Sequence, residues 1–165
     1  MASVKGFEVK AIKGFRGLEG EPLQQANLYY ENKKVGFLSD DAKGGSPVIQ
    51  VDEEFVSKWT EAITYFKDIL YDGKSVASGE ELFYFLLTVK EWEKIVNQQL
   101  KNGFSTVVIL EEIEITHGYR TGAYKVFSFN SDEESENLKE LGTDDSEPSE
   151  WRKSIFHSID DLNFQ

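Results

Sequence analysis

The sequence predicts an α+β domain in which an antiparallel sheet of about five to six strands is covered by two helices. Segments that alternate apolar and polar residues flank two longer segments with helical spacing. Short connections rich in Gly and Asn favour hairpins. The predicted order is four strands, two helices and two strands, followed by an acidic linker and a short C-terminal amphipathic helix. A small OB-like barrel is the alternative architecture.

The first four strands are predicted within residues 5–51. Residues 5–13 alternate as a half-buried strand does. A hairpin follows, with strands at 23–30 and 34–39 and a turn at Glu31–Asn32 or at Asn32–Lys33, because Asn tolerates a positive φ. Residues 48–51 form a short further strand.

Two amphipathic helices follow. Asp52 is a suitable N-cap for the first helix, and its apolar positions are Phe55, Trp59, Ala62, Ile63, Phe66 and Leu70. Ser78 and Glu81 form a capping box that opens the second helix, and Gly103 ends it. Residues 82–89 are apolar on more than one side, which indicates that the second helix is buried from two directions.

The last third of the chain divides into three parts. Residues 104–116 and 123–129 are strands, although Glu111 interrupts the apolar face of the first. Residues 131–150 hold nine acidic residues and one lysine, so we expect a linker. Residues 151–165 are predicted to be the amphipathic helix. The expected organisation is therefore a domain at 1–130, a linker at 131–150 and a terminal helix at 151–165.

Composition indicates a folded, acidic protein. The chain has 39% hydrophobic and 13% aromatic residues and a formal net charge of −12. It has no cysteine, which excludes disulfides and thiolate chemistry. The first residues contain no apolar segment of signal-peptide length, and no segment is apolar enough to cross a membrane. We expect a soluble, cytoplasmic protein without a membrane partner.

Catalytic and cofactor motifs are not found. Asp40 and Asp41 beside Gly44–Gly45 fit a turn better than a calcium loop. The acidic residues around Glu111 alternate in direction along a strand, so they do not converge with His117. The Gly-rich segment at 14–20 leads into a strand, whereas a phosphate-binding loop opens a helix. We therefore expect no catalytic residue, no metal and no cofactor.

The C-terminal residues are the predicted partner-binding site. Clustered carboxylates can attract a basic surface by long-range steering and can mimic phosphate charge. An amphipathic helix can dock in a groove of a partner, or it can complete the core of its own domain. The predicted contacts are Asp132, Glu133, Glu134, Asp144 and Asp145 in the acidic run, and Trp151, Ile155, Phe156 and Ile159 in the helix.

Ligand or nucleic-acid contacts are a second candidate. Tyr29, Lys33 and Lys34 provide aromatic and basic groups on the predicted strands, as single-stranded nucleic acid requires, and Arg120 precedes a late strand. Neighbouring acidic residues nearly cancel this charge, so nucleic acid is not the favoured partner. The alternatives to a protein-binding function are a single-stranded DNA-binding replication accessory with an acidic tail, and an enzyme acting on a small anionic ligand near Arg120.

Short motifs in residues 5–130 resemble a diffuse group of small proteins of phages and mobile elements. The motifs are Gly17-Leu18-Glu19-Gly20, Lys33 to Gly36, Asp40-Asp41, Gly44-Gly45 and Arg120. The resemblance implies a phage or mobile-element context, in which small acidic proteins inhibit host defence in the manner of anti-CRISPR or anti-restriction proteins. It carries over no catalytic residue. Our leading hypothesis is thus a non-enzymatic, phage-encoded inhibitor that binds a basic or nucleic-acid-handling host protein in the host cytoplasm.

Overall fold

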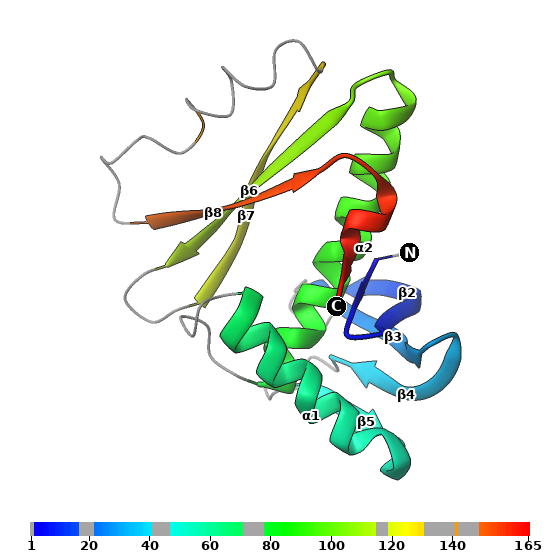
Figure 1. The fold of residues 1–165 in the computed structure, drawn as a ribbon. Helices are drawn as coiled ribbons and strands as arrows, with labels where there is room; N and C mark the ends of the chain where they lie inside the picture. The colour runs from blue at the N-terminus through cyan, green and yellow to red at the C-terminus, as the bar shows by residue number, and fades with distance from the viewer. Residues whose placement is uncertain are drawn as a thin grey trace.

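The computed structural model describes residues 2–16, 22–40, 47–70, 78–114, 119–130, 141 and 149–165 (Figure 1). These residues form an α+β fold with two α-helices and nine strands, which confirms the predicted fold class. The order of the first four predicted strands, the two helices and the next two strands is also confirmed. Two further strands and a strand in place of the terminal helix distinguish the structure from the prediction.

The strands form two sheets rather than the single antiparallel sheet that we expected. One has six strands, and its β1–β9 pair is parallel. The other has three antiparallel strands. In spatial order the six-stranded sheet contains β5 (Val48–Val51), β4 (Lys33–Ser39), β3 (Pro22–Tyr30), β2 (Phe7–Arg16), β1 (Ser3–Val4) and β9 (Asn163–Phe164). The three-stranded sheet contains β7 (Tyr119–Phe129), β6 (Thr106–Glu114) and β8 (Ser149–Phe156).

Local backbone features shape the six-stranded sheet. Glu31 and Asn32 both have positive φ, at 46° and 70°, which places the hairpin turn at the first of the two predicted positions. A Cβ at Gly36 would lie 2.2 Å from the carbonyl oxygen of Gln50, so only glycine allows β4 to approach β5. Ala11, with φ 53°, lies in a bulge after which β2 is exposed to solvent.

The helices begin and end close to the predicted positions. A 3₁₀ turn (η1, Glu53–Phe55) precedes α1 (Val56–Tyr65), and a π-helical turn (η2, Phe66–Leu70) follows it. Asp52 precedes η1 but makes no side-chain capping bond there. At the start of α2 (Gly79–Lys101), the Ser78 hydroxyl accepts a hydrogen bond from the Glu81 backbone N–H at 3.1 Å, which is the Ser78 half of the predicted capping box.

α2 lies between the two sheets (Figure 1). Toward the three-stranded sheet, the ring centroid of Trp92 lies 6.3 Å from those of Tyr124 and Phe156. Toward the six-stranded sheet, the ring of Phe85 lies 5.6 Å from that of Phe164. The expectation that this helix is buried from two directions is therefore confirmed, and its aromatic residues join the sheets in one core.

The prediction of a C-terminal amphipathic helix is wrong. Residues 149–156 form β8, which pairs with β6 from Val107↔Phe156 to Glu114↔Ser149. A 3₁₀ turn (η3, Ile159–Leu162) and β9 follow. The spacing of Trp151 and Ile155 fits one face of a strand as well as one face of a helix, because four is a multiple of the strand period. Pairing with β6, which is distant in the sequence, makes this segment a strand rather than a helix.

The predicted acidic linker lies almost entirely outside the described residues, so it stays a prediction. Residues 149–165, by contrast, contribute strands to both sheets. No helix among the described residues combines the length and the apolar character that crossing a membrane requires.

Candidate functional site

The three-stranded sheet has apolar residues on both faces. The inner face, toward α2, includes Val107, Ile109 and Phe156, which belong to the main core. Val108 and Leu110 of β6 alternate with these residues and therefore point to the other face, which we call the outer face. Both are buried, yet neither belongs to the main core cluster. The outer face thus has an apolar cluster of its own.

Cross-strand partners flank the two buried residues of the outer face. Val108 lies between Phe127 of β7 and Ile155 of β8. Leu110 lies between two lysines, Lys125 of β7 and Lys153 of β8. Directly opposite residues in an antiparallel pair share a face and contact one another. The outer face therefore has an apolar row next to a row with a lysine at each side.

Trp151 extends this surface. It is on the same side of β8 as Ile155, and the ammonium nitrogen of Lys125 lies 4.3 Å from the centroid of its indole ring. A cation over an aromatic ring is attracted by the ring quadrupole while its methylene groups cover apolar surface. Ile155 remains 40% exposed. A half-buried Trp and an exposed Ile over a buried apolar pair can anchor an apolar side chain of another molecule.

A buried ion pair lies on the inner face of the same sheet. Nη1 of Arg152 is 3.6 Å from Oε2 of Glu111, which is only 1% exposed. The Arg152 Nε–H also donates to the carbonyl oxygen of Leu70 at 2.8 Å. The pair joins β6, β8 and the end of η2. It explains why Glu111 interrupts an apolar strand face, and it gives Glu111 a structural role.

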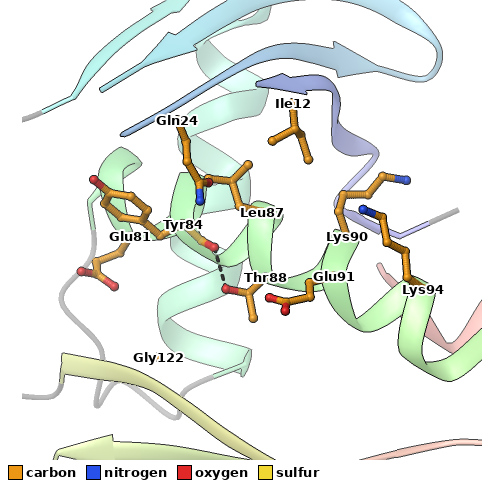
Figure 2. Close-up of a pocket in the computed structure, with 10 residues that line it drawn as sticks. All are labelled: Ile12, Gln24, Glu81, Tyr84, Leu87, Thr88, Lys90, Glu91, Lys94 and Gly122. Carbon is orange, nitrogen blue, oxygen red and sulfur yellow. Dashed lines mark hydrogen bonds between the residues drawn. The ribbon is translucent and has the colours of Figure 1, made fainter. Parts of the chain in front are cut away.

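A groove of about 510 Å³ lies between the two sheets along α2 (Figure 2). Its floor is one stripe of α2, and its sides are Ile12 and Gln24 on one hand and Gly122 of β7 on the other. The stripe contains Glu81, Tyr84, Leu87, Thr88, Lys90, Glu91 and Lys94. A volume of this size can hold a ligand, although most of these groups are polar.

Tyr84 in the groove and Tyr124, which bonds to the groove residue Glu91, keep their protons at neutral pH. The Tyr84 hydroxyl donates to Oδ2 of Asp40 at 3.3 Å, and burial together with the nearby carboxylate raises the pKa of Tyr84 to about 12. Burial and a hydrogen bond to Glu91 raise the pKa of Tyr124 to about 12. Both hydroxyls are therefore hydrogen-bond donors, and neither is a base at neutral pH.

The structure brings some predicted partner contacts together and separates others. Trp151 and Ile155 share the outer face, but Phe156 is buried in the core, and Ile159 packs against that core from η3. The predicted acidic contacts lie outside the described residues: Asp132, Glu133, Glu134, Asp144 and Asp145.

The predicted ligand contacts also separate. Tyr29 and Lys34 are paired across β3 and β4, on the face of the six-stranded sheet that points away from the core. Lys33 is on the opposite face, and its ammonium nitrogen lies 2.6 Å from Oε1 of Glu54. Arg120 is in β7, and its side chain lies outside the described set. His117 is also outside it. The structure therefore shows no joint site of these residues.

Two lysines and a phenylalanine of the outer face were missed by the sequence reasoning. Lys125 and Phe127 alternate with Tyr124 and Val126 along β7, so the period was visible. These residues form one surface only together with residues of β8. That surface could not be predicted, because residues 151–165 were expected to be helical. Among the described residues, no three His, Asp or Glu side chains are grouped as a metal site would require.

Comparison of the chain with protein-family models, curated proteins and solved structures finds no match.

Proposed function

We propose that this chain is a non-enzymatic binding protein that docks a basic partner protein on the outer face of its three-stranded sheet. One observation carries the proposal: Trp151, Phe127 and Ile155 cover a buried apolar pair that the main core does not use. Apolar surface gathered on one exposed face is typical of protein–protein contacts, and Trp is enriched among residues that dominate binding energy. Lys125 and Lys153 then lie at the rim, where their ammonium groups stay in water.

Charge supports a basic partner. The formal net charge is −12, and most of it is in residues 131–150. This run follows β7 and leads into β8, so it is attached at both ends to the strands that frame the outer face. A partner that binds this face is therefore within reach of the carboxylates, which raise its association rate. The resemblance to phage proteins supports the role of an inhibitor of a host defence or nucleic-acid-handling protein.

The test compares two aspartate substitutions at exposed aliphatic residues. Ile155→Asp alters the outer face, and Val48→Asp, at a 47% exposed residue of β5 in the other sheet, is the matched control. Each tagged variant is used to capture proteins from a bacterial lysate, and the captured protein is then purified and titrated. We expect the wild type and Val48→Asp to bind it, Ile155→Asp to bind more than about tenfold more weakly, and rising salt to weaken all binding.

Equal capture by all three proteins contradicts the proposed surface, because a buried charge at the centre of an apolar contact must weaken it. Binding that salt leaves unchanged contradicts the role of the acidic run. Glutamine and asparagine replacements throughout residues 131–150 separate the two conclusions. They remove the salt dependence while leaving the apolar contact in place.

Single-stranded DNA binding is the second candidate function, and one observation favours it. The ammonium group of Lys10 lies 4.7 Å from the ring centroid of Tyr29 on the outer face of the six-stranded sheet, next to Lys34. The buried Glu8, paired with Lys10 at 2.8 Å, opposes phosphate binding there. Fluorescence titration with labelled oligothymidine at low salt tests this function, and Tyr29→Ala must weaken binding about tenfold if bases stack on that ring.

A further inference from the structure

The groove along α2 is a second surface, and the proposed docking on the outer face does not use it. Its floor extends from Glu81 to Lys94 on one stripe of the helix. At 1.5 Å per residue this stripe is about 20 Å long, which equals about six residues of an extended chain. The groove is therefore the right length for a short peptide segment and too long for a compact small ligand to fill.

The walls of the groove also suit an extended chain. β7 pairs with β6 on one side only among the described strands, so it is an edge strand of its sheet. Gly122 places no side chain on this wall, and a Cβ there would meet no atom within 4 Å. Opposite it, Ile12 is 41% exposed and points toward Leu87 (Figure 2). Edge strands bind extended peptides through their backbone, and apolar pockets beside them select side chains.

The charges of the groove select the sequence of such a peptide. Lys90 is paired with Glu93, and Glu91 is hydrogen-bonded to Tyr124. Lys94 is exposed, and among the described residues it forms no ion pair or hydrogen bond. The Gln24 amide also extends into the groove (Figure 2). The Lys94 ammonium group can only donate and the NH2 group of the Gln24 amide can also donate, so a carboxylate can accept hydrogen bonds from both.

We propose that this groove binds an extended segment of another protein, about six residues long, with an acidic side chain opposite Lys94. An apolar side chain two residues along the segment, on the same side as the acidic one, contacts Ile12 and Leu87. The backbone of the segment runs along β7.

The probes are three blocked peptides of alternating valine and threonine, identical except for a central glutamate, glutamine or lysine. Binding is followed by methyl NMR of Ile12 and Leu87 in the full chain. The methyl groups of Val48 and Ile155 are the remote reporters. We expect saturating shifts at Ile12 and Leu87 only, and an affinity for the glutamate peptide about two- to fivefold higher than for the glutamine peptide, as an exposed ion pair gives.

Lys94→Glu is the decisive variant, because it must reverse the preference so that the lysine peptide binds best. Lys101→Glu makes the same charge change in the last turn of α2, outside the groove, and must leave the preference for glutamate unchanged. Neither residue is buried, so both variants are expected to fold.

Three outcomes overturn the proposal. The first is that no peptide shifts the Ile12 or Leu87 methyl groups. The second is that all three peptides bind equally to the wild type, or that Lys94→Glu does not change the order. The third is that inorganic phosphate produces the same shifts and displaces the glutamate peptide completely, which identifies a small-anion site. Each result leaves the Ile155→Asp test of the outer face unaffected.

Discussion

The two sheets differ most in the faces that point away from the core. On the six-stranded sheet, this face carries Glu8, Lys10, Asn27 and Tyr29, and the Lys10 ammonium group contacts Glu8, Asn32 and the Tyr29 ring. On the three-stranded sheet, the corresponding face carries Val108 and Leu110, flanked by Phe127 and Ile155. Both sheets bury their inner faces against α2.

The difference shows which of the two sheets has a polar, solvated face and needs no further layer over it. An antiparallel sheet normally alternates apolar and polar residues, so that one face is solvated. The six-stranded sheet follows this rule, whereas β6 reads Thr-Val-Val-Ile-Leu and is apolar on both sides. A strand of this kind belongs in the middle of three layers. We assign the third layer, over the outer face of the three-stranded sheet, to a bound partner protein.

The largest expected effect tests whether one residue of α2 holds both sheets. Trp92→Ala removes the ring that contacts Tyr124, Phe156 and Phe85. We expect a loss of about 3–5 kcal/mol in the free energy of unfolding, because a large cavity forms at the centre of the core. Urea denaturation measures the loss, and hydrogen exchange shows whether both sheets lose protection together. Protection lost in only one sheet would show that the sheets are stabilised independently. Lys94→Ala, on the exposed side of α2, is the control, with an expected change within about 0.5 kcal/mol.

A second substitution breaks the buried ion pair of the three-stranded sheet, which has no equivalent among the described core residues of the other sheet. Arg152→Met leaves the Glu111 carboxylate buried without this cation, so we expect a loss of about 3 kcal/mol in unfolding free energy. Adding Glu111→Leu removes the buried charge and must restore most of the stability. Urea midpoints of the single and double variants provide the measurement. A double variant as unstable as the single one would show that Arg152 acts through packing and its bond to Leu70.

A third pair of substitutions compares the two outer faces directly. Leu110→Ala deletes a buried apolar side chain, and we expect a loss of about 2 kcal/mol, at the low end of the usual range because flanking side chains can collapse. Asn27→Ala on the six-stranded sheet is expected to change stability by no more than about 0.5 kcal/mol. Thermal or urea unfolding of both variants gives the comparison. Equal effects would show that the two outer faces are energetically alike.

The smallest effect concerns pH. Burial alone would raise the pKa of Asp161, but hydrogen bonds from the backbone N–H groups of His157 and Ser158, at 2.6 and 2.8 Å, lower it below its ordinary value. A lowered pKa means that the folded state binds its proton less readily than the unfolded state. The stabilisation is therefore complete above the unfolded pKa and is lost as the pH falls through the folded pKa.

Asp161→Asn measures this contribution, which we expect to be about 0.5–1 kcal/mol at neutral pH, as for other exposed capping residues. The difference from wild type should shrink as the pH falls from the ordinary Asp pKa through the lowered pKa of the folded state, because the carboxyl group is then neutral in both the folded and the unfolded protein. A difference that stays constant with pH would attribute the effect to lost packing of η3.

How far the sequence predicts this fold depends on how local each feature is. The turn at Glu31–Asn32, the Ser78 cap and the doubly buried stretch of α2 are local patterns, and all three are confirmed. The division into two sheets was not predictable, because it depends on which strands pair across long separations. The same holds for β8, whose spacing fits a helix until β6 is available as a partner.

The candidate site was predictable only in part for the same reason. Trp151 and Ile155 were recognised as exposed apolar anchors, and they do share one face. Their neighbours on that face come from β7, about 25 residues earlier in the chain, and register alone brings them together. Glu111 looked like a defect in an apolar strand until Arg152 was placed opposite it.

The parallel pairing of β1 with β9 has a consequence for how the chain folds during synthesis. Ser3 and Asn163, which are 160 positions apart, hydrogen-bond through their side chains, and the Lys5 N–H donates to the Phe164 carbonyl oxygen at 2.7 Å. The ribosome must therefore translate through residue 164 before the edge of the six-stranded sheet is complete. The nascent chain carries its first strands without this neighbour until residues 163 and 164 have been synthesised. Pairing across so long a separation in sequence is slow, so we expect this edge of the sheet to form after the strand pairs that are close together in the chain.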